Sequence, residues 1–322
     1  MIIESTNVDL VQKPSFCQTP VTGSTGLNVL SLFDGMSCGQ IALQRAGIKV
    51  ENYFASEIEE RAIEVTMDNY PNTKQLGSVI DIKGSELPKI NLLIGGSPCQ
   101  SFSLAGTKKG MVTTENIEVL TLEHYLQLKN DGYSFSGQSY LFWEYVRLLK
   151  ETKPTYFLLE NVMMSPKWKQ IITNTLCVEP KVINSSIFSI QSRNRLYWTN
   201  IPFDVNIDDK GVFFKNNYSK EYDDSLVLKG KGLNKIERSR SRVYSIDSEK
   251  LPTLLKEQES KATDSIVIKH GEIYRYPTRD EAEIMQTVPI GYTKVAKYND
   301  AMGMLGNGWT VDVIAHIFGG LS

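Results

Sequence analysis

Five short apolar runs constrain the fold of this chain most strongly, because each has the length of a strand and is closed by a glycine or an acidic residue. They are LNVLSLF at 27–33, NYFASE at 52–57, SVIDI at 78–82, NLLIGG at 91–96 and TYFLLEN at 155–161. Segments with the apolar spacing of helices lie between them, at 39–48, 59–69 and 140–151. Strands that alternate with helices predict an α/β fold with a Rossmann-like sheet.

The composition is that of a globular protein. The 322 residues are 41% hydrophobic, which is enough for a sizeable core in one large domain or two ordinary ones. We expect a cytoplasmic protein, because no run of about 18 apolar residues occurs and the start of the sequence lacks the pattern of a signal peptide. The four cysteines are widely spaced without a CxxC pair, so neither a disulfide framework nor a metal site is indicated. The net charge of -2 excludes a uniformly basic nucleic-acid binder but allows a local basic patch.

Cys99 stands in a turn directly after one of the apolar runs. Pro98 precedes it and stiffens the turn, so the thiol is expected at a defined place near the carboxyl edge of the sheet, where ligands bind. A free cysteine is more often a small buried hydrophobe, and Pro-Cys alone does not decide between a structural residue and a nucleophile. The chemical interpretation therefore depends on partners elsewhere in the chain.

A glycine loop after the first run is typical of a nucleotide-type site. Residues 34–39 read DGMSCG and lead directly into a helical segment, so backbone N–H groups would face a ligand. The pattern departs from GxGxxG, which disfavours NAD. Glu57 follows about 20 residues beyond the loop, where a carboxylate can accept both hydroxyls of a ribose, although a helix cap is the alternative. Asp81, expected at the end of a third strand, could meet an adenine amino group.

The rest of the chain supplies further candidates. Residues 1–26 are read as an extended or disordered arm, and the glycine-containing segment 101–138 as a mobile loop beside the site. Glu160 closes the fifth run, and two strands at 180–200 place Arg193 and Arg195 on one strand face. Residues 229–242 hold six basic residues and one acidic residue, which favours contact with phosphates. A helix at 278–287 and a glycine turn leading into a final helix complete the expected elements.

In order along the chain, these segments resemble the motifs of the DNA cytosine-5 methyltransferases, from Leu27 to Leu321. The matching segments are SLFDGMSCG, Glu57, GGSPCQSFS, ENV at 160–162, QSRNR at 191–195 and GNGWTV at 306–311. Some details resemble the eukaryotic de novo enzymes, but the chain lacks their large accessory domains. It is therefore read as a compact prokaryotic or phage-type enzyme.

The resemblance implies a catalytic role for Cys99 as the nucleophile that adds to C6 of cytosine. Glu160 would donate a hydrogen bond or proton to N3, which requires a carboxyl group that holds its proton in a partly desolvated pocket. Arg195 would contact the base O2, and Arg193 would hold neighbouring groups in place. The implied cofactor is S-adenosyl-L-methionine, bound by Phe33, Asp34, Gly35, Met36, Ser37, Cys38, Glu57, Ile58, Asp81, Ile82, Pro98, Leu141, Asn307 and Trp309.

The same resemblance implies duplex DNA as substrate, with the target base flipped out of the helix. Residues 101–116 would close over the base, and a target-recognition region with a Thr-Leu element at Thr253 would read the sequence. The expected domains are an arm at 1–26, a catalytic domain at 27–202, a recognition domain at 203–275 and a returning segment at 276–322. The expected DNA contacts are Gln100, Ser101, Ser103, Lys108, Lys109, Lys229, Lys231, Lys235, Arg238, Arg240, Arg242 and Thr253.

Two other functions stay open at this stage. An RNA cytosine-5 methyltransferase of the same fold is disfavoured, because one such family carries a Cys-Phe-Thr tripeptide that is absent here and the others use a second cysteine where this chain has Glu160. A non-catalytic DNA-binding homologue would be expected to lack Cys99 or the donor-binding residues. A separate restriction endonuclease is a conceivable partner, and no membrane or metal is expected.

Overall fold

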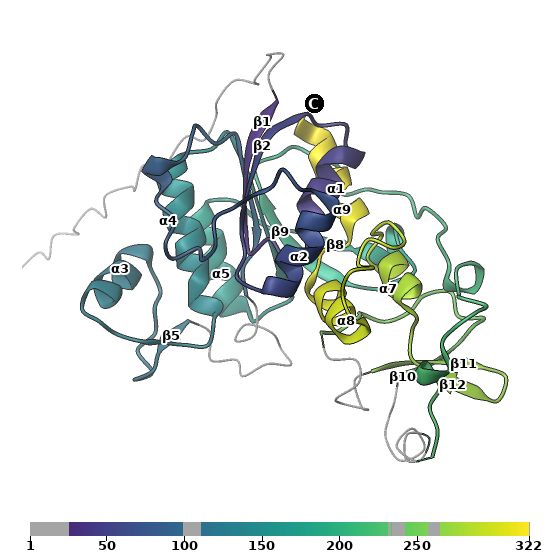
Figure 1. The fold of residues 1–322 in the computed structure, drawn as a ribbon. Helices are drawn as coiled ribbons and strands as arrows, with labels where there is room; N and C mark the ends of the chain where they lie inside the picture. The colour runs from purple at the N-terminus through teal and green to yellow at the C-terminus, as the bar shows by residue number, and fades with distance from the viewer. Residues whose placement is uncertain (1–25, 99–110, 231–232, 234–241, 257–264, 322) are drawn as a thin grey trace, which may run out of the picture.

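Helices cover both faces of a central sheet in the computed structural model, which describes residues 26–98, 111–230, 233, 242–256 and 265–321 (Figure 1). Helices α4 (Phe142–Thr152) and α5 (Pro166–Leu176) lie on one face. On the other face lie α1 (Cys38–Arg45), α2 (Glu60–Asn69) and α9 (Val311–Phe318). This three-layer arrangement confirms the α/β, Rossmann-like fold that the alternating pattern predicts.

The central sheet has seven strands in the order β3-β2-β1-β4-β7-β9-β8. The strands from β3 to β7 run parallel, whereas β9 is antiparallel to both of its neighbours. The chain moves outward from β1 to β3 and then returns to β4, so the strand order reverses between β1 and β4, where α/β proteins bind ligands. The strands are β1 (Leu27–Leu32), β2 (Val50–Ser56), β3 (Lys74–Gln75), β4 (Leu92–Gly96), β7 (Tyr156–Val162), β8 (Lys181–Asn184) and β9 (Asn194–Thr199).

Successive residues of the central strands are buried in two separate cores. Val29 and Leu158 pack in the core that includes α1 and α9, whereas Leu30 and Leu159 pack in the core that includes α4 and α5. All four side chains are inaccessible to solvent. Burial on both faces explains why these strands read as continuous apolar runs rather than as alternating ones.

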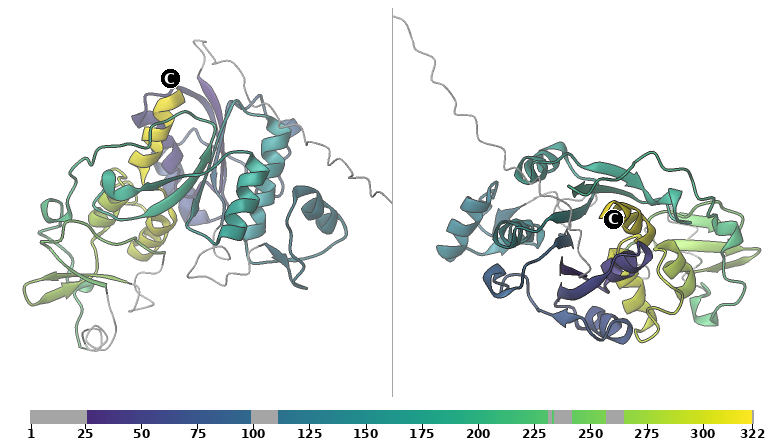
Figure 2. Two further views of the ribbon diagram at one scale, coloured as in Figure 1. Left: turned by 180° about the vertical axis from the view of Figure 1, so that it is seen from behind. Right: turned by 90° about the horizontal axis from the view of Figure 1, so that it is seen from above.

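The last third of the chain forms a second, smaller sheet and then returns to the first. Strands β10 (Arg242–Ser245), β11 (Ile266–His270) and β12 (Ile273–Arg275) make a three-stranded sheet beside the main body (Figure 2). Helices α7 (Arg279–Met285) and α8 (Tyr298–Asn307) follow, and α9 packs against α1. Thr278 is the N-cap of α7 and forms a capping box with Glu281, and α7 lies within the predicted helix at 278–287. The proposed domain boundaries stay a prediction.

Two expectations about local structure were wrong. Val79 to Asp81 form a turn, and the third parallel position is taken by the two-residue strand β3. Val79 and Ile82 are apolar because they pack into the α4 core, not because they pair in the sheet. The segment 101–138 is not one long loop, since its described part holds β5 (Val112–Thr113), α3 (Leu122–Asn130) and β6 (Phe135–Ser136).

A buried carboxylate attaches this additional α3 unit to the main body. Glu144 on α4 is inaccessible to solvent and accepts hydrogen bonds from the Tyr125 hydroxyl at 2.5 Å and the Lys129 ammonium at 2.7 Å, both from α3. Arg147 Nε contributes a third contact at 2.6 Å. Such a group is stable only while all of its donors are in place. None of the helices in the described part of the chain combines the length and apolarity that crossing a bilayer requires.

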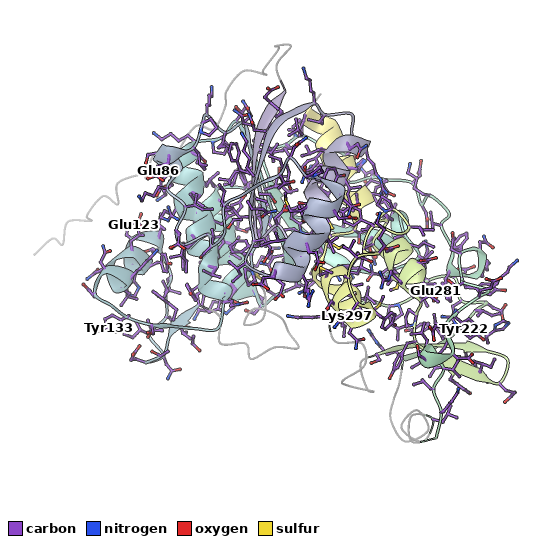
Figure 3. All side chains as sticks on the ribbon, in the orientation of Figure 1. Glu86, Glu123, Tyr133, Tyr222, Glu281 and Lys297 are labelled. Carbon is purple, nitrogen blue, oxygen red and sulfur yellow. The ribbon has the colours of Figure 1, made fainter. Side chains whose placement is uncertain are left out.

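We predict that Glu144→Gln destabilises the protein by on the order of 3 kcal/mol, because it leaves two cations beside a buried neutral group. The matched control is Glu123→Gln. Glu123, labelled in Figure 3, also joins α3 to α4, through Lys150 at 3.1 Å, but both side chains are more than half exposed. Urea unfolding should show a large loss for the first variant and little change for the second. Equal losses would contradict the importance of burial.

Candidate active site at the carboxyl edge of the sheet

The loop after β1 has an unusual backbone. Phe33, Gly35 and Ser37 all have positive φ, at 56°, 58° and 60°. Two of these are not glycine, and such strain in a non-glycine residue persists only where the surroundings enforce it, often at ligand sites. The loop is fixed by hydrogen bonds from Asp34 N–H to Ser56 O and from Ser37 N–H to Asp34 O, both at 3.1 Å. It ends at the start of α1, as predicted.

The Glu57 carboxylate reaches back from the end of β2 to this loop. Its Oε2 accepts the Gly35 N–H at 2.8 Å, and its Oε1 accepts the N–H groups of Ile58 and Glu59 at 2.7 and 2.9 Å. Glu57 can therefore be both a helix cap and a ligand-binding residue. It accepts N–H groups just before α2, and it also contacts the loop that is predicted to bind the methyl donor. Ile58 beside it is 68% exposed.

Asp34 is the most perturbed acidic group of the loop. Its carboxylate accepts the hydroxyls of Tyr53, at 2.7 Å, and Ser37. Burial nevertheless raises the pKa of Asp34 to about 6, since removing the charged form from water outweighs the hydrogen bonds that stabilise it. Burial also raises the pKa of the Cys38 thiol to about 12. The thiol therefore keeps its proton, and the side chain of Cys38 serves to pack the core.

The remaining residues predicted to bind the methyl donor differ in their exposure to solvent and in the elements that carry them. Asp81 is exposed in its turn, and Ile82 is buried in the core, so neither ends a strand at the sheet edge as expected. Met36 is buried, and its carbonyl accepts the Tyr292 hydroxyl at 2.7 Å. Leu141 is half-buried just before α4. Asn307 is the exposed last residue of α8.

The turn that precedes Cys99 is held by a residue of the neighbouring strand. Asn161 on β7 donates its side-chain amide to the backbone oxygen and to the hydroxyl of Ser97, at 3.1 and 3.0 Å. Pro98 follows at the end of the described range. Cys99 itself lies outside the described residues, as do the predicted DNA contacts Gln100, Ser101, Ser103, Lys108 and Lys109. The sequence gives no sign of this role of Asn161, because its partner Ser97 lies on a different strand end far away in the chain.

Glu160 lies at the same edge with both carboxylate oxygens engaged. Gly96, two residues before Pro98, is its register partner across β4 and β7. Glu160 is 8% exposed. Its Oε1 lies 3.0 Å from Arg195 Nε, and its Oε2 accepts the Trp309 indole N–H at 3.1 Å. The structure therefore brings together three residues that the sequence predicted separately, from β7, β9 and the turn before α9.

Arg193 has a different environment from Arg195. Its guanidinium is buried and donates to the backbone oxygens of Leu254, Gly306 and Gly308, at 3.1–3.3 Å. These contacts join the predicted recognition region to the turn that carries Trp309. The expected role of Arg193 in holding neighbouring groups in place stays a prediction.

Two buried glutamines extend this junction and were not predicted as site residues. Gln191 accepts the Leu254 N–H at 2.6 Å and donates to Gln286 Oε1 at 3.1 Å. The same oxygen of Gln286 accepts the Thr310 hydroxyl at 2.9 Å, while its amide nitrogen donates to Leu305 O at 2.6 Å. Gln286 is the C-cap of α7 and Gln191 lies in the loop before β9, and neither position gives a sequence signal for such a role, because the partners are far away in the chain.

The predicted recognition segment lies against the QSRNR segment. Thr253 donates its hydroxyl to Ser192 O at 2.9 Å, and its own carbonyl accepts Arg242 Nη2 at the same distance. Lys229 is exposed. The other predicted phosphate contacts, Lys231, Lys235, Arg238 and Arg240, lie outside the described residues.

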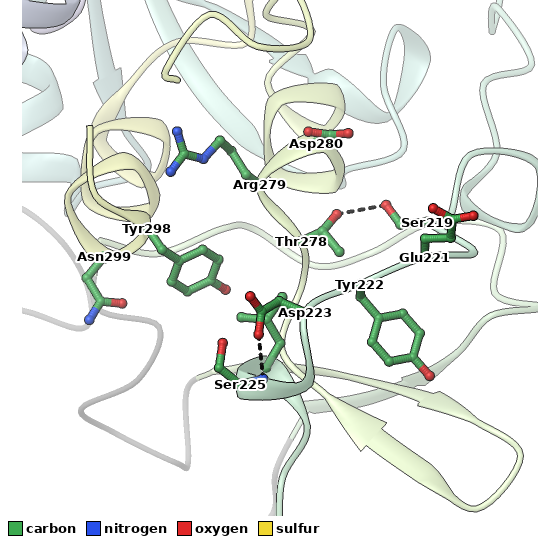
Figure 4. Close-up of a pocket in the computed structure, with 11 residues that line it drawn as sticks. Ser219, Glu221, Tyr222, Asp223, Ser225, Thr278, Arg279, Asp280, Tyr298 and Asn299 are labelled. Carbon is green, nitrogen blue, oxygen red and sulfur yellow. Dashed lines mark hydrogen bonds between the residues drawn. The ribbon is translucent and has the colours of Figure 1, made fainter. Parts of the chain in front are cut away.

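A pocket of about 570 Å³ lies elsewhere, between the 219–226 segment and the starts of α7 and α8 (Figure 4). Glu221, Asp223 and Asp280 line it together with the rings of Tyr222 and Tyr298. None of its lining residues is a predicted site residue. Within the described ranges, no group of three His, Cys, Asp or Glu side chains is arranged to hold a metal ion.

The raised pKa of Asp34 predicts a pH-dependent penalty on folding. Below the ordinary pKa of 3.8, Asp34 is protonated in both the folded and the unfolded protein, and its burial carries no charge penalty. As the pH rises from there through about 6, the free energy of unfolding falls, because the unfolded protein ionises this group more readily than the folded protein does. Asp34→Asn removes the charge with little change in shape, so we expect the variant to be more stable than the parent protein at pH 8. The difference should shrink as the pH falls from 6 toward 4. Thermal unfolding across this range tests it, and a constant difference would contradict the assignment.

The sequence comparisons identify related proteins. A family model of C-5 cytosine-specific DNA methylases matches residues 27–229. The orphan methyltransferase M.Rho11sI of Bacillus phage rho11s is 30% identical over 205 residues, covering 59% of this chain and 36% of that protein. The Type II methyltransferase M.NlaIV of Neisseria lactamica is 29% identical over 195 residues, covering 54% and 41%. The matches thus span less than half the length of these relatives.

Solved structures share the fold over nearly the whole chain. Schizosaccharomyces pombe (S. pombe) Dnmt2 methyltransferase superposes with a TM-score of 0.72 at 16% identity, covering 91% of this chain and 97% of that one. The Entamoeba histolytica methyltransferase EhMeth gives 0.71 at 16% identity, with 92% and 98% covered. These likenesses show the fold, and the family match over residues 27–229 shows that the chain belongs to the C-5 cytosine-specific DNA methylase family.

Proposed function

We propose that this protein transfers a methyl group from S-adenosyl-L-methionine to C5 of a flipped-out cytosine in a specific duplex DNA sequence. The observation that carries the proposal is the carboxyl group of Glu160, held by Arg195 and Trp309 opposite Gly96. Gly96 stands two residues before Pro98, which leads to Cys99. A nearly buried carboxyl group at the end of the strand next to the one that leads to Cys99 suits general acid catalysis on a base.

The donor site proposed at the β1 loop fits the chemistry of S-adenosyl-L-methionine. Glu57 and Ile58 offer a carboxylate for hydroxyl groups beside an exposed apolar side chain. The added Cβ of an alanine at Gly35 would meet nothing within 4 Å, so the loop has open space on that side. When bound, the cofactor supplies an electrophilic methyl group. The loop residues would bind and orient it at the point where the strand order reverses.

Covalent catalysis explains why both a thiol and an acid are needed. The Cys99 thiolate adds to C6, which forms the S–C6 bond and moves the electron pair of the C5–C6 double bond through the ring toward N3. Glu160 donates a proton to N3, and Arg195 contacts the base O2. Once C5 is methylated, loss of its proton restores the C5–C6 double bond and expels the thiolate, and the N3 proton returns to Glu160. The base can react in this way only after it leaves the duplex, at a cost of a few kcal/mol.

The choice of DNA rests on the family match and on the sequence arguments against RNA enzymes. The structural likeness to Dnmt2 and EhMeth, at 16% identity, supports the fold alone. The segment around Thr253 and Arg242 is proposed to read the target, since it is anchored to the same strand region as Arg193. The Type II relatives suggest, as part of this proposal, a role in restriction-modification with a separate endonuclease.

We predict that Cys99→Ser abolishes transfer of labelled methyl groups to DNA, because serine does not supply a comparable nucleophile. Glu160→Gln should lower the rate by about 100-fold or more, since it removes the acid at N3. Cys177→Ser is the control, because Cys177 is an exposed free cysteine. The measurement is incorporation of tritium from S-adenosyl-L-methionine into mixed-sequence DNA or tRNA, with the product base mapped.

Cys99-dependent label as 5-methylcytosine in DNA, with the control active, supports the proposal and gives the recognised sequence. Label in tRNA alone would move the substrate to RNA. Absence of label in both nucleic acids, despite binding of the donor, would favour a non-catalytic homologue.

A further inference from the structure

Trp309 lies between the predicted donor loop and the catalytic carboxyl group. An ideal Cβ built on Gly39, the second residue of α1, would lie 3.7 Å from the indole Cζ3. The neighbouring Gly308 packs against the side chains of Met36 and Cys38. A Cβ added to Gly308 would lie 3.3 Å from Met36 Cε and 3.3 Å from Cys38 Sγ. On its other side, the indole Nε1–H donates to Glu160 Oε2. The resemblance accounts for Trp309 only as a residue that lines the donor pocket.

The two partners of Glu160 occupy different oxygens. Arg195 Nε lies 3.0 Å from Oε1, and Trp309 Nε1 lies 3.1 Å from Oε2. The terminal torsion of a glutamate has a broad energy profile, so one donor alone leaves the carboxyl plane free to turn. A second donor on the second oxygen fixes that plane. The orientation of the plane decides which oxygen faces N3 of a bound base.

The close packing at Gly96 shows that this arrangement is sterically defined. A Cβ at residue 96 would lie 3.0 Å from the Trp309 Nε1 and 3.1 Å from the Glu160 Oε2, which is tighter than nine in ten Cβ contacts in proteins. The absence of a side chain at Gly96 therefore leaves the space in which the indole and the carboxyl group meet. The hydrogen bond is a built feature of the strand edge rather than a surface contact.

We propose that Trp309 is a positioning residue, whose indole N–H orients the carboxyl group of Glu160 for proton transfer to the base. This inference rests on the proposed function. It assigns Trp309 a role in the addition of Cys99 to cytosine, a step that occurs before the methyl donor reacts. Loss of the indole N–H should therefore impair the base chemistry even where no donor is present.

Exchange of the C5 hydrogen without donor isolates that step. When the thiolate has added to C6 and N3 has gained a proton, C5 takes a proton from water. Loss of the original C5 hydrogen as a proton then restores the double bond and expels the thiolate, and the N3 proton returns to Glu160. Release of tritium from C5-labelled DNA into water measures this cycle. We expect Trp309→Phe to slow the release by about 10- to 100-fold, the effect typical of misplaced catalytic groups.

Trp198→Phe is the matched control. It also removes a buried indole N–H, which donates to Thr173 Oγ1 at 3.0 Å, but that bond joins β9 to α5 away from Glu160. Unfolding curves should show that both variants fold, and Trp198→Phe should exchange as fast as the parent protein per folded molecule. The dissociation constant of the donor, measured by calorimetry, should change less in Trp309→Phe than the exchange rate does.

A double-mutant cycle separates positioning from general packing. If Trp309 acts through Glu160, then Trp309→Phe should slow exchange far less in a Glu160→Gln background than in the parent protein. Additive effects, or an unchanged exchange rate in Trp309→Phe together with weaker donor binding, would overturn the inference and leave Trp309 as a pocket residue. Failure of the proposed function looks different, because the parent protein itself would then release no tritium.

Discussion

The register between β4 and β7 is the constraint on which the site depends. It sets Gly96 opposite Glu160, so the strand with the glycine turn and the strand with the carboxyl group end together. A slip of one residue would turn Glu160 to the other face of the sheet and move Asn161 away from Ser97. Both strands are buried on both faces, and their packing against two cores specifies this register. The geometry of the site is thus a consequence of how the core packs.

A buried polar junction then fixes the later part of the chain onto this edge. Arg193, Gln191 and Gln286 satisfy backbone groups of the recognition segment and of the turn after α8. Buried hydrogen-bond networks of this kind specify one arrangement, because any other would leave polar groups without partners. The segment proposed to read DNA and the turn that carries Trp309 therefore share one set of anchors.

The sequence predicted the elements whose signals are local, and it did less well where long-range packing decides the outcome. Glycine after the first strand, Thr278 before α7 and the apolar strand runs are local signals, and the structure confirms the elements they predict. SVIDI has the same apolar character but supplies core contacts from a turn, and only tertiary packing distinguishes the two cases. The family pattern named Glu160, Arg195 and Trp309 as site residues, but their contacts with one another and the hydrogen-bonding roles of Asn161 and Gln286 depend on partners that no spacing reveals.

The return of the chain to its beginning has a consequence for synthesis. Because α9 packs on α1 and the turn before α9 brings the indole to Glu160, the carboxyl group gains its second donor only after residues near 309 have left the ribosome. The strands and the glycine loop are made much earlier, but the core on the α1 face of the sheet lacks the side chains of α8 and α9 until the end of synthesis. A nascent chain thus holds Glu160 and Arg195 before it holds the indole that contacts the second carboxylate oxygen. Under the proposed function, the site would be complete only after the segment proposed to read DNA has also been made.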